Sequence, residues 1–391
     1  MSTFPDGFEK LIPSIREVSD FIHDHPELGL EEFQASAKLK ELLRSNGFAV
    51  EENAGGLATA FKASWQTPNG ADAPCFAFMG EFDALPGLGH ACGHNLISAA
   101  ALAAVLCAKI ELEKRGVPAR ICFIGTPAEE IKGGKVAMIE GGAFNGIAVS
   151  LIAHPFHKTI PDPGCLSVSR CTVAFHGRAS HAAIAPEKGI NALDAVAEFC
   201  CDIREWRKHI GERERVHGII TRGGDAPNII PDYTEAFYYV RAPGEKAILP
   251  LKKHLEGLAD KAAKSTGCTA EVKWISAYKG MIFNEPLNDA FIRVWRERGV
   301  EIPRTNGTEG KGSTDAGDVS CIMPCAHYYF GITGGKNYAP HTIEFREAAR
   351  TPEAFGQAMA AGSAMSEICI RYFTETDFRK AVHEAFDRAE K

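Results

Sequence analysis

The sequence predicts an α/β fold organised in two domains. Its 391 residues exceed the usual size of one hydrophobic core, so two domains are expected. Short apolar runs bounded by turn residues alternate with stretches of helical spacing, which is typical of helices packed over a parallel or mixed sheet. The turn-rich stretch 161–164 (PDPG) then separates two regions of different pattern, which makes it a candidate domain boundary.

The first region begins with helices and continues with strands. Apolar residues recur at helical spacing over 8–21 and 31–44, and Asn46-Gly47 is a stop signal after the second helix. A core helix is expected over the apolar segment 96–108. Short apolar runs predict four strands, at 57–63, 75–79, 119–124 and 149–153.

The residues after 164 predict a compact unit of their own. The expected order is βαββαβ, with strands at 166–175, 216–221, 234–240 and 269–276 and helices at 190–208 and 245–264. From Met281 helical spacing returns, followed by the Gly- and Asp-rich loop 312–318 and an apolar strand near Tyr328. We therefore expect residues 165–279 to be inserted into one discontinuous domain formed by 1–164 and 280–391.

Charge and composition limit the classes of molecule that this protein is expected to bind. The formal net charge of −7 and the lack of a long Lys/Arg run argue against nucleic acid, and small polar or zwitterionic substrates fit better. No secretory signal is visible, and the longest apolar segment, 96–108, is too short to span a bilayer, so no membrane is expected. Most of the 12 cysteines lie in apolar runs, as reduced thiols do in cytoplasmic proteins.

The densest chemistry lies in residues 89–95 (GHACGHN), just after the acidic run 80–83. Read alone, Cys92 could be a small buried hydrophobe and His94 a helix cap. Further candidate ligands follow in separate segments: Glu129 with Glu130, His154, and His341. Several of these segments follow predicted strands, where α/β folds place their sites. Thiolate, imidazole and carboxylate together suit Zn²⁺, Mn²⁺, Co²⁺ or Ni²⁺.

Motifs across nearly the whole chain carry a family resemblance. The sequence resembles the dinuclear-metal amidohydrolases of the aminoacylase and glutamate-carboxypeptidase superfamily, in particular the branch with auxin-conjugate hydrolases, aminobenzoyl-glutamate hydrolase and β-alanyl-lysine dipeptidase-like proteins. The matching motifs are HPELG at 25–29, GEFDALP at 80–86, HACGHN at 90–95, GTPAEE at 125–130, AHP at 153–155, HGRASH at 176–181, APNIIP at 226–231, VRAP at 240–243 and PH at 340–341. Asn95, where many relatives carry Asp, points to the aminobenzoyl-glutamate and β-alanyl-lysine side of the branch.

The resemblance implies a zinc-peptidase-like catalytic domain with a mixed sheet, and it makes the inserted βαββαβ (ferredoxin-like) unit a lid and dimerisation domain. It implies two divalent metal ions. Mn²⁺ or Zn²⁺ is the expected metal, and Co²⁺ or Ni²⁺ is the alternative. Cys92 matches the cysteine that bridges the metals, and the other implied ligands are His94, Glu130, His154 and His341.

Further roles follow from the same resemblance. Glu129 matches the general acid/base, and Asp83 matches a carboxylate that orients a ligand. His181 matches a histidine that reaches the active site of the partner subunit in a homodimer and polarises the scissile carbonyl. Asn228 and Arg241 match lid residues that hold the substrate's carbonyl or carboxylate. The implied activity is hydrolysis of the amide bond in a small N-acyl amino acid or dipeptide, aminobenzoyl-glutamate-like or β-alanyl-lysine-like.

Simpler readings of these residues stay open. Glu129-Glu130 could begin a helix, Asp83 and Asn228 could be turn residues, and Arg241 could lie on a strand surface. Asp315 and Asp318 lie in a loop of a kind that often borders such sites, but no role is assigned to them. His90, His157 and His176 match no ligand position of the family. They are left out of the predicted set.

Alternative activities also remain. Cys92 could be a nucleophile with a neighbouring histidine as its base. The same dinuclear site could deaminate an aromatic amine, or the chain could be a metal-binding scaffold without catalysis. Treatment with a chelator separates the thiol mechanism from the metal-dependent ones.

Overall fold

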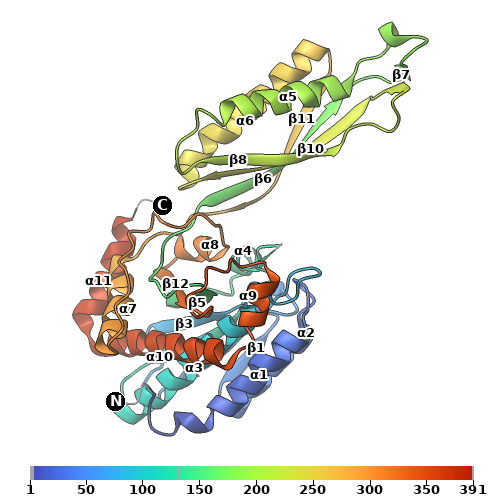
Figure 1. Cartoon of the computed structure of the whole chain (residues 1–391). Coiled ribbons are helices and arrows are strands. Elements are labelled where there is room, and N and C mark those ends of the chain that lie inside the picture. Colours follow the sequence, from blue (N-terminus) through green and yellow to red (C-terminus); the bar gives the residue numbers. More distant parts are fainter. Residues whose placement is uncertain (1–3, 131, 390–391) are drawn as a thin grey trace. The chain divides into compact units, whose positions relative to one another are not determined.

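The chain folds into two compact units. The computed structural model describes residues 4–130 and 132–389 (Figure 1). One unit consists of Met1–Gly164, Met281–Gly310 and Thr314–Lys391, and the other of Cys165–Gly280 and Lys311–Ser313. The short segment 311–313 joins the second unit, although we expected it in the first, because Gly312 O accepts the backbone N–H of Leu166 at 2.9 Å and Ser313 Oγ donates to Leu166 O at 2.7 Å.

The first unit is built on a six-stranded sheet, which is mixed, as predicted, and has one strand more than expected. Its order is β1-β2-β4-β3-β5-β12. Strands β3, β4, β5 and β12 are parallel to their neighbours in this set, whereas β2 runs antiparallel to both β1 and β4. The strands are β1 Ala49–Glu52, β2 Phe61–Gln66, β3 Cys75–Gly80, β4 Arg120–Gly125, β5 Ile147–Phe156 and β12 Cys325–Gly331.

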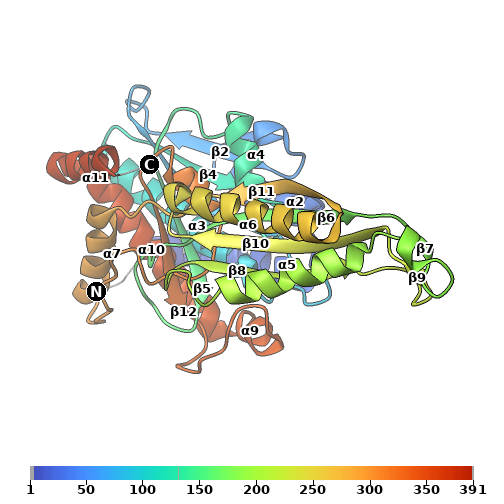
Figure 2. The same ribbon diagram turned by 90° about the horizontal axis from the view of Figure 1, so that it is seen from above.

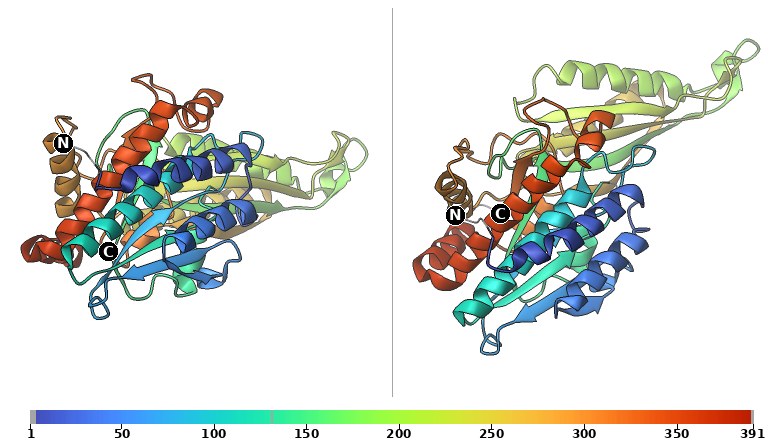
Figure 3. Two further views of the ribbon diagram at one scale, coloured as in Figure 1. Left: turned by 90° about the horizontal axis from the view of Figure 1, so that it is seen from below. Right: turned by 60° about the horizontal axis from the view of Figure 1, so that its bottom comes forward.

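Helices cover both faces of this sheet. On β3, Phe76 and Phe78 belong to one apolar core, and Ala77 and Met79 belong to another on the opposite face. The first core contains residues of α1 (Ile12–Asp24), α2 (Phe33–Ser45), α3 (His94–Arg115), α7 (Glu285–Glu297), α9 (Ile343–Ala348), α10 (Pro352–Thr374) and α11 (Thr376–Arg388). The second contains residues of α4 (Gly134–Glu140) and α8 (Ala316–Ser320). Figure 3 shows α1, α2, α3 and α10 side by side.

Helix α3 is the centre of the first core. It is longer than the predicted 96–108 segment, and by length and composition alone it could cross a membrane. However, 83% of its most apolar 18-residue window is buried inside the protein, so it is a core helix, as predicted. Gly362 of α10 is packed so closely that a Cβ there would lie 2.4 Å from Ala100 O. A run of alanines facing a glycine thus lets α3 and α10 approach closely.

The second unit is an antiparallel four-stranded sheet with two helices on one face (Figures 1 and 2). The sheet order is β11-β6-β10-β8, and β7 pairs with β9 in a separate two-stranded ribbon. Burial alternates along β10, as expected when one face packs on helices and the other faces solvent. The elements are β6 Ser167–His176, β7 Ser180–His181, α5 Ala192–Trp206, β8 Arg215–Arg222, β9 Ile229–Ile230, β10 Tyr233–Ala242, α6 Glu245–Thr266 and β11 Thr269–Tyr278.

Candidate metal centre and catalytic residues

Four of the predicted site residues of the first unit, together with Glu81, come from the carboxyl ends of adjacent parallel strands, while Cys92 and His94 lie at the start of α3 and His341 lies just before α9. Glu81 and Asp83 follow β3, Glu129 and Glu130 follow β4, and His154 lies near the end of β5. Thr126 N–H donates to Gly80 O at 2.8 Å, which joins the first two of these strand ends. The fold therefore brings polar groups from distant sequence positions to one edge of the sheet.

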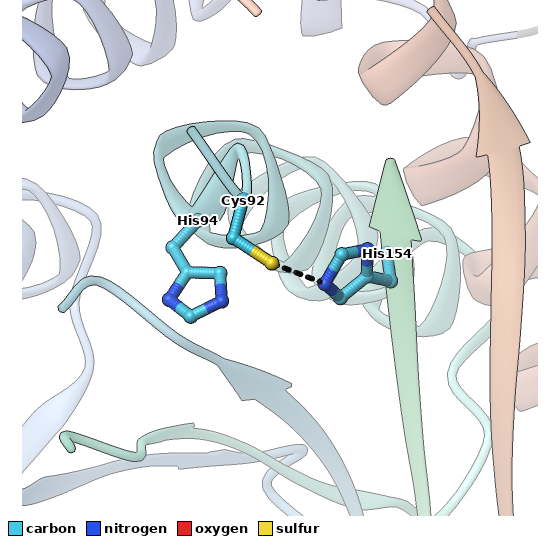
Figure 4. A group of neighbouring side chains, drawn as sticks. All are labelled: Cys92, His94 and His154. Carbon is cyan, nitrogen blue, oxygen red and sulfur yellow. Dashed lines mark hydrogen bonds between the residues drawn. The ribbon is translucent and has the colours of Figure 1, made fainter. Parts of the chain in front are cut away.

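Cys92, His94 and His154 form the first group that could hold a metal ion (Figure 4). Cys92 Sγ lies 3.4 Å from His154 Nε2, and His154 Nδ1–H donates to Pro155 O at 2.7 Å, which leaves the Nε2 lone pair facing the sulfur. Gly93 has a φ of 75°, and a Cβ there would lie 2.6 Å from Pro155 Cγ. A glycine between the two predicted ligands is therefore required both by backbone conformation and by space.

Cys92, Glu130 and His341 form a second group. His341 Nε2 lies 3.2 Å from Glu130 Oε1. Asp83 connects the two groups, because its Oδ1 accepts from His94 Nδ1 at 3.0 Å and its Oδ2 accepts the backbone N–H of Glu130 at 3.1 Å. Asp83 is thus placed to orient two predicted ligands, which is the kind of outer contact that metal sites use.

The atoms that converge here are suited to a cation. Burial acts to lower the pKa of His94, but Asp83 and Cys92 outweigh it and raise that pKa well above its usual value, so without a metal the ring favours a second proton. A neutral His94 that donates from Nδ1 to Asp83 presents a lone pair at Nε2, and this is the form that can bind a metal. That atom lies 3.5 Å from Glu81 Oε2 and 3.7 Å from Glu130 Oε1. All three atoms are buried and have no hydrogen-bond partner within the described residues. Buried carboxylate oxygens and a ring nitrogen that converge in this way need a shared cation, either a proton or a metal ion, so the residues present fit a metal ion.

The adjacent Glu129 and Glu130 have opposite pKa shifts. Burial, followed by the negative charge of Glu81, raises the pKa of Glu129 well above its usual value. Burial also acts to raise the pKa of Glu130, but His341 and His94 outweigh it and lower that pKa to about 2. Opposite pKa shifts in two neighbouring carboxyl groups are expected when they have different roles. Glu129, with the raised pKa, suits proton transfer, and Glu130, with the lowered pKa, suits a ligand that stays charged.

The loop that carries both glutamates is held in an unusual backbone conformation. Ala128 has a φ of 59°, a region that non-glycine residues seldom adopt. Glu32 accepts the N–H of Ala128 at 2.8 Å and the hydroxyl of Thr59 at 2.8 Å. Gly29 leaves room beside the loop, because a Cβ there would lie 2.9 Å from Ala128 Cβ. His341 also has a positive φ, of 67°. Strain of this kind is concentrated at functional sites.

Sequence reasoning gave no role to four residues that line this edge. Lys135 is fully buried, and its Nζ lies 2.6 Å from Glu81 Oε1 and 2.7 Å from Asp315 Oδ1. The ring of His327 on β12 lies 5.6 Å from that of His154. Glu81 belongs to the GEFDALP motif, so its place after a strand was a usable signal. Nothing local marks Lys135, because its partners are 54 and 180 residues away in the chain.

The other predicted residues lie in the second unit. His181 and Asn228 lie close together, since His181 pairs with Ile229 between β7 and β9 and Asn228 O accepts the N–H of Ala182 at 3.0 Å. Arg241 lies near the far end of β10, where its Nη1 donates to Ser313 Oγ at 2.6 Å. The stretch of β10 between Tyr233 and Arg241 spans roughly 26 Å, at about 3.3 Å per residue. Tyr233 pairs with His176 at the end of β6, and the β7–β9 ribbon that carries His181 lies beyond this end of the sheet (Figure 1), so the unit does not bring Arg241 together with the other two.

Comparison with known proteins identifies the family. Residues 77–354 match the model of peptidase family M20/M25/M40. The chain belongs to this family. It is 36% identical to the Xaa-Arg dipeptidase of Homo sapiens over 94% of this chain and 88% of that protein. It is 33% identical to one subunit of the p-aminobenzoyl-glutamate hydrolase of Escherichia coli, over 75% of this chain and 64% of that protein.

Solved M20 structures share the fold. The YXEP protein of Bacillus subtilis, described as a dinuclear metal binding peptidase from the M20 family, matches with a TM-score of 0.69 at 20% identity over 90% of this chain and 98% of its own. The aminobenzoyl-glutamate utilization protein of Klebsiella pneumoniae matches with a TM-score of 0.70 at 18% identity, over 94% and 98%. The resemblance inferred from the motifs is thereby confirmed, and the M20 chain is an enzyme of the metal-dependent amidohydrolase and metallopeptidase type.

Proposed function

We propose that this M20 chain hydrolyses the amide bond of a small dipeptide or N-acyl amino acid, using two divalent metal ions. The observation that carries the proposal is the set of buried polar atoms of Glu81, His94 and Glu130 that converge beside Glu129, a carboxyl group whose pKa is raised by burial. The proposed metal-holding residues are Cys92, His94, Glu130, His154 and His341, with Cys92 between the two groups because both include its sulfur.

Glu129 is the proposed general acid/base. Divalent metals supply Lewis acidity and lower the pKa of water when they are bound. Glu129 takes the proton of the attacking water and delivers it to the amine that leaves. The cycle starts from the carboxylate form of Glu129. Its raised pKa suits this cycle, because it makes the carboxylate a stronger base and lets the group hold the proton between the two transfers. Asp83 fixes the ring of His94 and the backbone of Glu130, so it acts as a positioning residue.

His181 is the proposed donor to the substrate carbonyl. Its Nδ1 accepts the backbone N–H groups of Ala183 and Ile184 at 3.2 and 3.3 Å. The proton of the neutral ring must then be on Nε2, which leaves a donor directed away from the chain's own backbone. A donor of this kind stabilises the charge that develops on a carbonyl oxygen.

A homodimer would explain the separation of the lid residues. A dipeptide extends about 7 Å, far less than the roughly 26 Å of strand between Tyr233 and Arg241. One substrate can therefore contact both His181 and Arg241 only if they come from different subunits. Strand β8 is an edge of the second unit's sheet, and its Ile219 and Ile220 are 65% and 46% exposed. An open edge with exposed apolar residues suits pairing with a second copy.

The relatives guide the proposed substrate class. Their names refer to dipeptides that end in arginine and to aminobenzoyl-glutamate. We propose a substrate whose released amine is a charged amino acid, as in β-alanyl-lysine-like dipeptides or aminobenzoyl-glutamate, with Asn228 and Arg241 as its lid contacts. The proposed metals are Mn²⁺ or Zn²⁺, with Co²⁺ and Ni²⁺ compatible, and the proposed location is the cytoplasm.

A mass-spectrometric screen tests this function. Mn²⁺-loaded protein is incubated with dipeptides, N-acyl amino acids, aromatic amines and aminobenzoyl-glutamate. We expect release of a free amino acid, loss of activity with a chelator, and recovery on addition of Mn²⁺ or Zn²⁺. Activity that survives complete metal removal would support Cys92 as a nucleophile. Release of ammonia alone would indicate deamination, and metal binding without any turnover would indicate a scaffold.

A further inference from the structure

The sheet edge at which the proposed metal ligands converge, called the metal edge below, contains a buried charge cluster. The cluster is formed by Glu81, Lys135 and Asp315. All three side chains are fully buried. Lys135 Nζ lies between the two carboxylates, and Asp315 Oδ2 also accepts the backbone N–H of Lys135 at 2.9 Å. A fully buried ammonium is tolerated only when it is paired with good geometry, and Lys135 is paired twice.

The two carboxylates of the cluster differ in one respect. Asp315 uses both oxygens on Lys135. Glu81 uses only Oε1 on Lys135, while its Oε2 has no hydrogen-bond partner among the described residues and faces His94 Nε2 at 3.5 Å. Glu81, His94 and Glu129 also offer ligand atoms within 4.8 Å of one another. A buried carboxylate oxygen kept free at this position points to a cation as its partner.

We infer that Glu81 is a further carboxylate of the metal centre and that Lys135, anchored by Asp315, positions it. By holding Oε1, Lys135 leaves one oxygen for the metal held by His94. The cluster carries one net negative charge, so it adds a single charge to the site instead of two. This inference rests on the proposed metal-dependent function but assigns roles to residues outside the predicted ligand set.

The test is a metal titration of the full chain with Mn²⁺ and Zn²⁺, in competition with a chromophoric chelator. We expect Glu81→Gln to weaken one of two binding events by about 10- to 100-fold, the range seen when supporting groups of metal sites are removed. The matched control is Asp162→Asn, because Asp162 is equally buried but accepts the backbone N–H groups of His327 and Gly164. Its metal affinity should stay within threefold of wild type.

A charge-conserving variant tests the positioning role. In Lys135→Met with Asp315→Asn, the cluster keeps one net negative charge but Glu81 loses its anchor. We expect at least tenfold weaker metal binding and an altered Co²⁺ absorption spectrum, while Lys135→Arg recovers part of the affinity. Thermal unfolding verifies that each variant is folded.

The outcomes separate the inference from the function. If wild type binds two metals and folded Glu81→Gln binds them with unchanged affinity and an unchanged Co²⁺ spectrum, the role of Glu81 is wrong and the proposed function stands. If the charge-conserving variant binds as wild type does, Lys135 is not a positioning residue. If wild type binds no metal, the proposed function itself fails.

Discussion

Asp83→Asn is the most informative change at the metal edge, because one atom is exchanged while the shape is kept. The carboxylate of Asp83 accepts at both oxygens, from His94 Nδ1 at 3.0 Å and from the N–H of Glu130 at 3.1 Å. An asparagine can accept from Glu130 only if its amide nitrogen faces His94. That nitrogen is a donor, so His94 must move its proton to Nε2, where it would point toward Glu81 Oε2 and Glu130 Oε1.

The proton would then occupy the direction in which a metal is expected. Loss of an orienting carboxylate lowers metal affinity by about 10- to 100-fold, which corresponds to about 1.4 to 2.7 kcal/mol. If the amide flips instead, its donor faces the N–H of Glu130, and a buried unsatisfied group costs about 1 to 3 kcal/mol. Either arrangement weakens the site by a similar amount.

The assay is chelator competition with Zn²⁺ on folded protein, with Asp162→Asn as the buried-carboxyl control. We expect Asp83→Asn to bind metal at least tenfold more weakly and the control to bind normally. Activity at saturating metal should recover in large part, because Glu129 is untouched. If folded Asp83→Asn binds Zn²⁺ with wild-type affinity, the orientation of His94 by Asp83 does not matter and the assignment is wrong.

Three further predictions follow from the same geometry. Glu129→Gln should lower kcat by about 10²- to 10⁴-fold with metal affinity within threefold of wild type, and near-normal turnover would remove Glu129 from the mechanism. The pKa of Glu32 is raised to about 7 by burial, so the folded state holds this proton between about pH 4.5 and 7 while the unfolded state has lost it. The stability of wild type relative to Glu32→Gln should therefore fall by up to about 3 kcal/mol as pH rises through that window, which urea unfolding at pH 4.5 and 8 measures; a flat difference would contradict the raised pKa. Mixed His181→Ala and Glu129→Gln subunits should regain part of the activity in heterodimers, and confirmed heterodimers without activity would indicate a site built within one subunit.

The sequence predicted the central strands because they are buried on both faces. Strands β3 and β4 are continuous apolar runs, and their predicted ends lie within a residue of those observed. Strand β1 was missed because its four residues, AVEE, are largely exposed and show no apolar pattern. The strand predicted at 57–63 begins at Phe61, since residues 57–60 form a turn in which Ala60 N–H donates to Leu57 O.

Helix α10 shows a different limit. It is buried nearly all around, so its apolar residues do not recur on one face, and periodicity gives no clear signal. Most of the cysteines are buried, as their apolar runs predict, but Cys201 is exposed. Cys201 lies in an apolar part of α5, but it is on the face of the helix that is turned to solvent, so its apolar neighbours in the sequence do not mean that it is buried.

The candidate site was predictable where residues carry a motif and not where they depend on distant partners. Cys92, His94, Glu130, His154 and His341 were proposed as ligands from family motifs, and the structure groups their side chains. Asp315 lies in a loop of a kind that often borders such sites, but it was left out of the predicted ligand set. Its pairing with Lys135 joins segments 180 residues apart, which no local pattern reveals.

The central claim is that hydrolysis depends on two metal ions held at this edge of the sheet. The most direct measurement adds Zn²⁺ or Mn²⁺ stepwise to metal-free protein while release of Lys from β-alanyl-lysine, or of Glu from aminobenzoyl-glutamate, is followed. We expect no turnover without metal and activity that reaches its maximum at two equivalents per chain. Full turnover by the metal-free protein would contradict the claim.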